Sequence, residues 1–361
     1  MTSEQPAALP EGVAPGRGAG RGSAADEGPD ARSGRPGRGA PAVVATVATL
    51  AAGAAVAVQT SVNGHVSVAT GSPVLATAVN HGSALLIALV VALAMGALPR
   101  AARNLRARRA QLRRWWFLGG VMGFVAVLAI ITVTPEVGVV AVAVAVTLGQ
   151  LAGSVLADGA GLGPGGRRPL SVLRAVGLAV AVAAVVVGAL GRFDLGNAFV
   201  IPVVVLAGAV IAVQQAANGW LIVVTGEFAA MSVINFVTSG VFVGIALLVS
   251  LAVAPIDFGA LPPWAPVGGT LGVAIGVVTA LTVRTIGVLS AILCIAAGQA
   301  IAAVVLDLLV PVDAVGLTPA AIVAAALAVA AVGIAGLGSA PRRSSRRARR
   351  RSPLAETGIL P

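Results

Sequence analysis

The chain has 361 residues, of which 58% are hydrophobic and 10% are charged, and its mean hydropathy is +0.98. A soluble domain usually carries about 25% charged residues, so this composition excludes a soluble globular protein and indicates an integral membrane protein. The formal net charge is +11 although the sequence has no lysine, which excludes a nucleotide-binding P-loop because that loop needs one. A single cysteine and two histidines exclude a disulfide framework and leave little material for a metal site.

Both ends of the chain differ in composition from its centre. Residues 1–41 are rich in Gly, Pro, Ala and Ser and carry five Arg and five acidic residues, and residues 339–361 carry seven Arg and one Glu. Segments with few large apolar side chains cannot bury enough surface to fold. We therefore expect a disordered cytoplasmic tail at the N-terminus, without a signal peptide, and an Arg-rich cytoplasmic tail at the C-terminus.

Between the tails, apolar segments recur at about the 20 residues that a helix needs to cross a bilayer. In chain order they predict ten transmembrane helices, over residues 42–65, 74–98, 115–134, 137–157, 171–190, 199–222, 228–253, 265–283, 286–308 and 318–338. The breaks at Thr134–Glu136 and Val283–Thr285 are short. The expected fold class is an all-α integral membrane protein with ten transmembrane helices.

Arginine gathers on one side of this predicted topology. Seven Arg lie in the connecting loop 99–114 and two in the loop 158–170, whereas the loops of the other side hold only Arg192. Because basic residues are retained on the cytoplasmic side, we expect both termini in the cytoplasm. We interpret the positive charge as an orientation signal and a contact for anionic lipid headgroups, and not as a nucleic-acid interface.

The second half of the chain repeats polar, tryptophan and glycine positions of the first half. Gln59, Asn63, Gly64, Gly71 and Asn80 return 155 residues later as Gln214, Asn218, Gly219, Gly226 and Asn235, while Trp115, Gly119, Gly120, Gly123, Gly138, Gly149, Gln150 and Asp158 return 149 residues later as Trp264, Gly268, Gly269, Gly272, Gly287, Gly298, Gln299 and Asp307. These identities indicate a duplication, with five-helix repeats at 42–191 and 199–338. Because five is odd, the second copy must enter the membrane from the opposite side, which predicts an inverted repeat.

Several of these motifs also resemble a known family. VQTSVNGH at 58–65 and VQQAANGW at 213–220, with GG-x-x-G and GQ-x7-D patterns in both halves, look like the YdcZ-like branch of the drug/metabolite transporter superfamily. The resemblance covers roughly residues 42–338. It implies a ten-helix inverted-repeat fold and a small-molecule exporter in the bacterial plasma (inner) membrane, and it supplies neither a substrate nor an established set of transport residues.

Polar side chains within the predicted spans are functional candidates, because hydrocarbon is a costly environment for them. Gln150 and Gln299 are equivalent in the two repeats and lie near mid-depth, where inverted-repeat transporters bind their substrates. They either line a substrate pathway or hydrogen-bond across a helix interface. The GG-x-x-G patterns put small residues on one helix face and predict close helix crossings.

Six further amides fall into two equivalent sets. They are Gln59, Asn63 and Asn80 in the first repeat and Gln214, Asn218 and Asn235 in the second. Carboxamides both donate and accept hydrogen bonds, which suits a polar or cationic organic solute. The structural alternative is bonding between helices, or helix ends at Asn63–Gly64 and Asn218–Gly219.

Three ionisable residues are weaker candidates. His81, whose equivalent is Phe236, is a candidate for proton coupling because histidine titrates near neutral pH, with a hydrogen-bonded packing role as the alternative. Asp158 and Asp307 fall at equivalent span ends and are gating candidates, or else solvated helix-end carboxylates. Glu227 is expected to be a wetted cytoplasmic residue. No catalytic residue, metal site or cofactor site is predicted.

A secondary transporter that moves a small metabolite or drug by alternating access is the favoured function. The alternative is a lipid-handling or structural multi-pass membrane protein without a solute pathway. An enzyme is not expected, because the spans lack clustered carboxylates, nucleophile–histidine sets and metal ligands. The solute, the direction of transport and the coupling ion stay open, as does the oligomeric state, a homodimer included.

Overall fold

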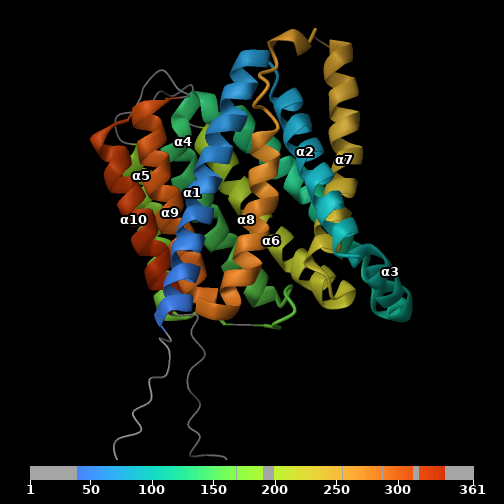
Figure 1. The fold of residues 1–361 in the computed structure, drawn as a ribbon. Coiled ribbons are helices and arrows are strands. Elements are labelled where there is room, and N and C mark those ends of the chain that lie inside the picture. Colours follow the sequence, from blue (N-terminus) through green and yellow to red (C-terminus); the bar gives the residue numbers. More distant parts are fainter. Residues whose placement is uncertain are drawn as a thin grey trace, which may run out of the picture. The chain divides into compact units, whose positions relative to one another are not determined.

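The computed structural model describes residues 39–167, 169–189, 199–253, 255–286, 288–311 and 317–337. Within these ranges the secondary structure consists of ten α-helices and short 3-10 turns, with no β-strand (Figure 1). The predicted C-terminal tail and almost all of the predicted N-terminal tail lie outside the described residues.

The helices follow one another with short connections. They are α1 (Gly39–Thr70), α2 (Pro73–Ala94), α3 (Ala97–Ala107), α4 (Gly119–Ala160), α5 (Val172–Ala189), α6 (Val200–Thr225), α7 (Phe228–Val253), α8 (Val267–Ile286), α9 (Val288–Leu309) and α10 (Pro319–Leu337). Seven of them are long and apolar enough to cross a membrane, namely α1, α2, α4, α6, α7, α9 and α10, and shorter apolar stretches lie in α5 and α8. An all-α membrane protein is therefore confirmed.

A single helical run, α4, covers the third and fourth predicted spans. The break expected at Thr134–Glu136 lies slightly further along the chain, because Pro135 is within the helix and the backbone leaves the helical region at Gly138, with φ 81° and ψ 167°. Only glycine adopts this conformation without strain. The glycine, and not the proline before it, separates the two parts of α4.

The first helices of the two halves, α1 and α6, continue beyond their predicted ends. The hypothesis that Asn63–Gly64 and Asn218–Gly219 stop these helices is wrong, because α1 runs to Thr70 and α6 to Thr225. The glycines directly after them, Gly71 at φ 63° and Gly226 at φ 73°, adopt the left-handed conformation that commonly ends a helix. These two glycines are equivalent in the sequence repeat, so both helices end in the same way.

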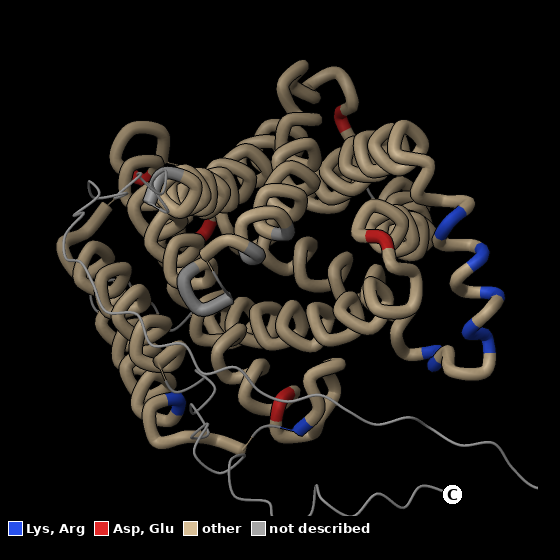
Figure 2. Tube along the Cα trace, turned by 60° about the horizontal axis from the view of Figure 1, so that its bottom comes forward, with Lys and Arg blue, Asp and Glu red and all other residues tan. Residues whose placement is uncertain are grey.

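The Arg-rich segment 99–114, expected to be a connecting loop, contains the short helix α3. Ala97 and Ala101 of α3 are buried, whereas Arg103 and Arg106 are exposed. Figure 2 shows basic residues gathered along the part of the chain that includes α3, with charges only scattered elsewhere among the described residues. The segment is therefore a cationic amphipathic helix, with a small apolar side against the protein.

Helices of the two halves pack largely on one another. α1 packs against α8 and α9, α4 packs against α6 and α7, α2 contacts α7 and α8, and α5 packs on α10. The closest approaches occur at glycines: Gly149 of α4 lies against the backbone of Val205 in α6, and Gly298 of α9 lies against the backbone of Leu50 in α1. Small residues let helix backbones approach this closely. The two halves thus share one interface.

Candidate functional site

The first set of amides forms a buried cluster between α1 and α2. Asn80 Oδ1 accepts a hydrogen bond from Gln59 Nε2 at 3.2 Å and another from Asn63 Nδ2 at 3.1 Å. The cluster lies against Gly268 and Gly272 of α8, where an added Cβ atom would collide with the amides of Asn63 and Gln59 respectively. The GG-x-x-G face of α8 therefore makes room for the amides of the first half.

The second set forms the equivalent cluster between α6 and α7. Asn235 Nδ2 donates to Asn218 Oδ1 at 2.6 Å and lies 3.3 Å from the sulfur of Met231. Asn235 Oδ1 is buried and has no hydrogen-bond partner among the described residues. Glycines of α4 pack against this second set. Gly119 lies against Asn218 and Asn235, and Gly123 lies against Gln214.

The structure thus joins five of the six amides in two separate hydrogen-bonded groups, and it places Gln214 against Gly123, on the α4 face that packs on the second group. Among the described hydrogen bonds, none joins one cluster to the other. Bonds between neighbouring helices are what the structural alternative predicts, and they satisfy polar groups that would be costly in hydrocarbon. Contact of these amides with a solute stays a prediction.

Gln299 lines a small pocket between α4, α9 and α10. Its other lining residues include Val140 and Thr147 of α4 and Ala325 of α10, and its volume of about 10 Å³ is the space of one water molecule. Gln150 is exposed and follows Thr147 by one turn, on the same face of α4. Gln299 therefore lines the pocket from α9, whereas Gln150 lies one turn beyond its lining on α4, and the pocket has no room for an organic solute in this conformation.

His81 is buried in α2 between two aromatic rings. Its Nδ1 donates to the carbonyl oxygen of Thr77 at 3.0 Å. The rings of Phe124 and Phe236 approach it at centroid distances of 6.5 and 6.1 Å, both nearly perpendicular to the imidazole. This hydrogen-bonded environment resembles the packing alternative, and proton coupling by His81 stays a prediction.

Asp307 and Asp158 occupy different environments although they are equivalent in the repeat. Asp307 is 2% exposed, and its carboxylate accepts hydrogen bonds from the backbone N–H groups of Val139 at 3.0 Å and Val140 at 2.9 Å. Because these residues follow the break at Gly138, Asp307 caps the start of the second part of α4. Asp307 is therefore not a solvated helix-end carboxylate.

Asp158 lies at the other end of the same part of α4. Its Oδ2 pairs with Nη2 of Arg174 in α5 at 2.6 Å, and the Asp158 side chain is 29% exposed. Hydrogen bonds to charged partners are among the stronger ones in proteins. The two carboxylates therefore make different contacts in this conformation, one with a helix start and one with an arginine.

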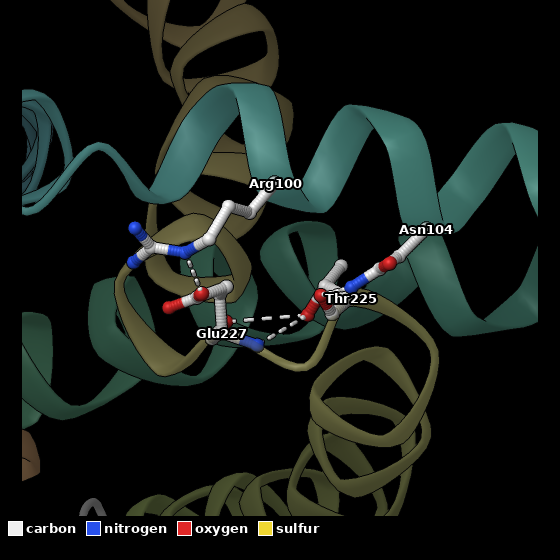
Figure 3. A network of polar contacts seen from close by, with 4 residues as sticks. All are labelled: Arg100, Asn104, Thr225 and Glu227. Atoms are coloured by element: carbon white, nitrogen blue, oxygen red, sulfur yellow. Dashed lines mark hydrogen bonds and ion pairs between the residues drawn. The ribbon is translucent and has the colours of Figure 1, made fainter.

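Sequence reasoning missed a polar network that ties α3 to the turn between α6 and α7 (Figure 3). Arg100 Nε donates to Glu227 Oε1 at 2.5 Å, Asn104 Nδ2 donates to the Thr225 carbonyl oxygen at 2.7 Å, and Arg108 adds a similar bond to Val223. The hydrogen bond from Arg100 lowers the pKa of Glu227 below its ordinary value and raises the pKa of Arg100.

The expectation that Glu227 is simply wetted is therefore incomplete, because the side chain is 17% exposed and ion-paired. A signal for α3 was present in the sequence, since Ala97, Ala101 and Leu105 recur every four residues among the arginines. The partner Glu227 lies 127 residues away in the sequence, a separation that periodicity does not bridge.

Seven of the described helices are long and apolar enough to cross a membrane, which defines a multi-pass membrane protein and fits a transporter. Models of known families match residues 44–187 and 199–334 to the family described as "Putative inner membrane exporter, YdcZ". The two regions cover more than half of the chain, so the chain belongs to this family. The description is that of an exporter and not of an enzyme, and the comparisons with curated proteins and with solved structures find no match.

Proposed function

We propose that this protein is a secondary transporter that exports a small organic metabolite or drug by alternating access. In this proposal the two halves are inverted five-helix repeats, the chain crosses the inner membrane ten times, and both termini are cytoplasmic. The observation that carries the proposal is the reciprocal packing of the two halves, described below. Family membership supports the direction of transport, because the family is described as an exporter.

Each contact between amides of one half and glycines of the other has an equivalent contact with the halves exchanged. The amides of α1 and α2 lie against the GG-x-x-G face of α8, and the amides of α6 and α7 lie against the same face of α4. If residue i of one half contacts residue j of the other and their equivalents do the same, a two-fold relation accounts for both contacts. Because each proposed unit has an odd number of spans, consecutive units enter the membrane from opposite sides, so the two-fold axis lies in the membrane plane, as in many secondary transporters.

Charge distribution supports the orientation. The segment 99–114 holds seven Arg, whereas its equivalent 254–263 holds none and carries Asp257. Because arginine is retained in the cytoplasm, the two segments are expected on opposite sides of the membrane. The exposed Arg of α3 would then lie beside the anionic headgroups of the inner leaflet.

The proposed solute pathway runs between α4 and α9, past Gln299 and Gln150. The pocket at Gln299 is too small for an organic solute in this conformation, so transport requires these helices to part. Ala and Val dominate the rest of the lining. Glutamine would supply neutral hydrogen-bond donors and acceptors to a polar solute.

Orientation can be tested with single cysteines in a Cys294→Ala background. Arg106→Cys and Asp257→Cys change exposed residues of the two equivalent segments. A membrane-impermeant maleimide should label the first only from the cytoplasmic side and the second only from the outside. Labelling of both from the same side would refute the inverted repeat.

Transport itself can be tested in proteoliposomes with a panel of organic solutes, with and without a pH gradient. We expect Gln150→Ala and Gln299→Ala to reduce flux, because each removes a polar group from the proposed pathway. Asp257→Asn is the control, since its side chain caps only the exposed turn Phe258–Ala260. Lipid transfer without solute flux would instead favour the lipid-handling alternative.

A further inference from the structure

We propose that Asp307 and Asp158 are alternating latches, each of which closes one end of the membrane domain by capping a helix of the other half. The inference rests on the proposed function, because it assigns a role to these residues within alternating access. They are positioning residues, and no contact with the solute is needed.

The latch at Asp307 is formed in this structure. Its carboxylate, 98% buried on α9, accepts the hydrogen bonds of Val139 and Val140 on α4. A buried carboxylate is costly unless donors surround it, so the end of α9 cannot leave α4 without exposing both the charge and two free N–H groups. The bond therefore ties the second half to the first at this end.

Duplication places the parts of a second latch at the opposite end. Gly138, Val139 and Asp307 have the equivalents Gly287, Val288 and Asp158 at the offset of 149 residues. α9 begins at Val288, directly after Gly287, as the second part of α4 begins at Val139 after Gly138. When the halves exchange conformations, Asp158 therefore reaches the first N–H groups of α9.

The asymmetry between the two carboxylates indicates which state is present. Asp158 is paired with Arg174 in place of a helix start, and it is partly exposed. In the proposed topology the Asp307 end faces outward, so this state is closed to the outside. Arg174 holds Asp158 away from α9, and release of that ion pair closes the cytoplasmic end as the outer latch opens.

The test measures from which side of the membrane a thiol reagent reaches the pocket. Thr147→Cys, on the pocket wall, is introduced into the full chain with Cys294→Ala and reconstituted in liposomes. An impermeant maleimide is added from one side at a time. Asp307→Asn should raise the rate of labelling from outside by at least about tenfold, because hydrogen bonds to charged groups are the stronger class.

Arg174→Gln provides a second variant that leaves the Asp307 latch intact. Freeing Asp158 should also raise labelling from outside, and Asp158→Asn should cancel that effect in the double variant, whereas Asp158→Asn alone should not raise it. Asp257→Asn should change nothing. Arg174→Gln and its double variant with Asp158→Asn therefore test the latches even if Asp307→Asn does not fold.

Three outcomes separate the proposals. Faster labelling from outside in Asp307→Asn and in Arg174→Gln, with the effect of Arg174→Gln cancelled by Asp158→Asn, supports the latches. One-sided labelling that none of these variants changes overturns the latches and leaves the pathway standing. Failure of the cysteine to label from either side in every variant contradicts the pathway itself.

Discussion

The second glycine of each GG-x-x-G pattern gives the sharpest test of how the halves pack. At Gly120 an added Cβ would overlap the Asn235 carbonyl oxygen and lie 2.8 Å from the backbone N of Ser239. At Gly269 it would overlap the Asn80 carbonyl oxygen and lie 2.8 Å from the N of Ala84. These neighbours are helix backbone, so the helices must separate to admit a methyl group.

We therefore expect Gly120→Ala and Gly269→Ala each to destabilise the protein. Overpacking costs about 1–3 kcal/mol, and the better helix propensity of alanine offsets roughly 0.5–1 kcal/mol of it. The net loss is therefore about 0–2.5 kcal/mol. It corresponds to a fall of up to a few degrees in Tm, because the shift per kcal/mol is roughly 2–4 °C at 150–250 residues and smaller for a longer chain. Thermal unfolding in detergent micelles measures this directly.

Matched controls come from helical glycines in open space. At Gly82 of α2 and Gly240 of α7, an added Cβ meets no heavy atom within 4 Å. Gly82→Ala and Gly240→Ala should therefore keep or raise the Tm, since alanine favours the helix. The reasoning is refuted if Gly120→Ala and Gly269→Ala unfold at the temperature of these controls, or if only one of the two is destabilised.

Three further predictions follow from the polar contacts. Asn80→Ala leaves the amide donors of Gln59 and of the buried Asn63 unpaired, and it should lower stability by about 1–3 kcal/mol. The loss should exceed that of Asn235→Ala, because Asn235 Oδ1 has no described partner, and denaturant titration compares the two variants. Because pairing lowers the pKa of Glu227, the stability that the ion pair contributes is complete above the ordinary Glu pKa and is lost as the pH falls through the lowered one. The protection of α3 amides against hydrogen exchange, relative to the intrinsic exchange rate at each pH, should therefore fall in acid, and Glu227→Gln should abolish this dependence. Replacing Arg103 and Arg106 by Gln should reduce the interaction free energy with phosphatidylglycerol, relative to phosphatidylcholine, by about 1 kcal/mol per Arg. The readout is a smaller rise in Tm on going from phosphatidylcholine to phosphatidylglycerol, and an equal rise in the variant and the unchanged protein would argue against lipid contact.

Apolar runs located the helices because a membrane span must satisfy its backbone internally and cover itself with apolar side chains. The errors occur where length and hydropathy carry no information. Whether α4 breaks at Pro135 or at Gly138 depends on a local conformation that only glycine tolerates. The helix α3 escaped detection because a short amphipathic helix with many Arg resembles a loop by composition.

The candidate site was predictable to the extent that it is local or duplicated. Spacing placed Gln59 and Asn63 on one helix face, and duplication identified the equivalent set in the second half. The packing of these amides against glycines of α8 and α4 could not be predicted, because contacts between the halves depend on how helices distant in the sequence pack. For the same reason the sequence indicated Asp307 as a gating candidate without identifying Val139 and Val140 as its partners.

His81 adds a separate argument for the two-fold relation. A residue that lies next to a two-fold axis contacts its own equivalent across that axis. His81 and Phe236 are equivalent in the repeat, and their rings lie 6.1 Å apart, at the contact between α2 and α7. In the proposed arrangement the axis therefore passes between them, at a position where the halves carry different side chains. His81→Phe would make this contact symmetric, and its effect on the balance between the two latch states would show whether the difference biases the transport cycle.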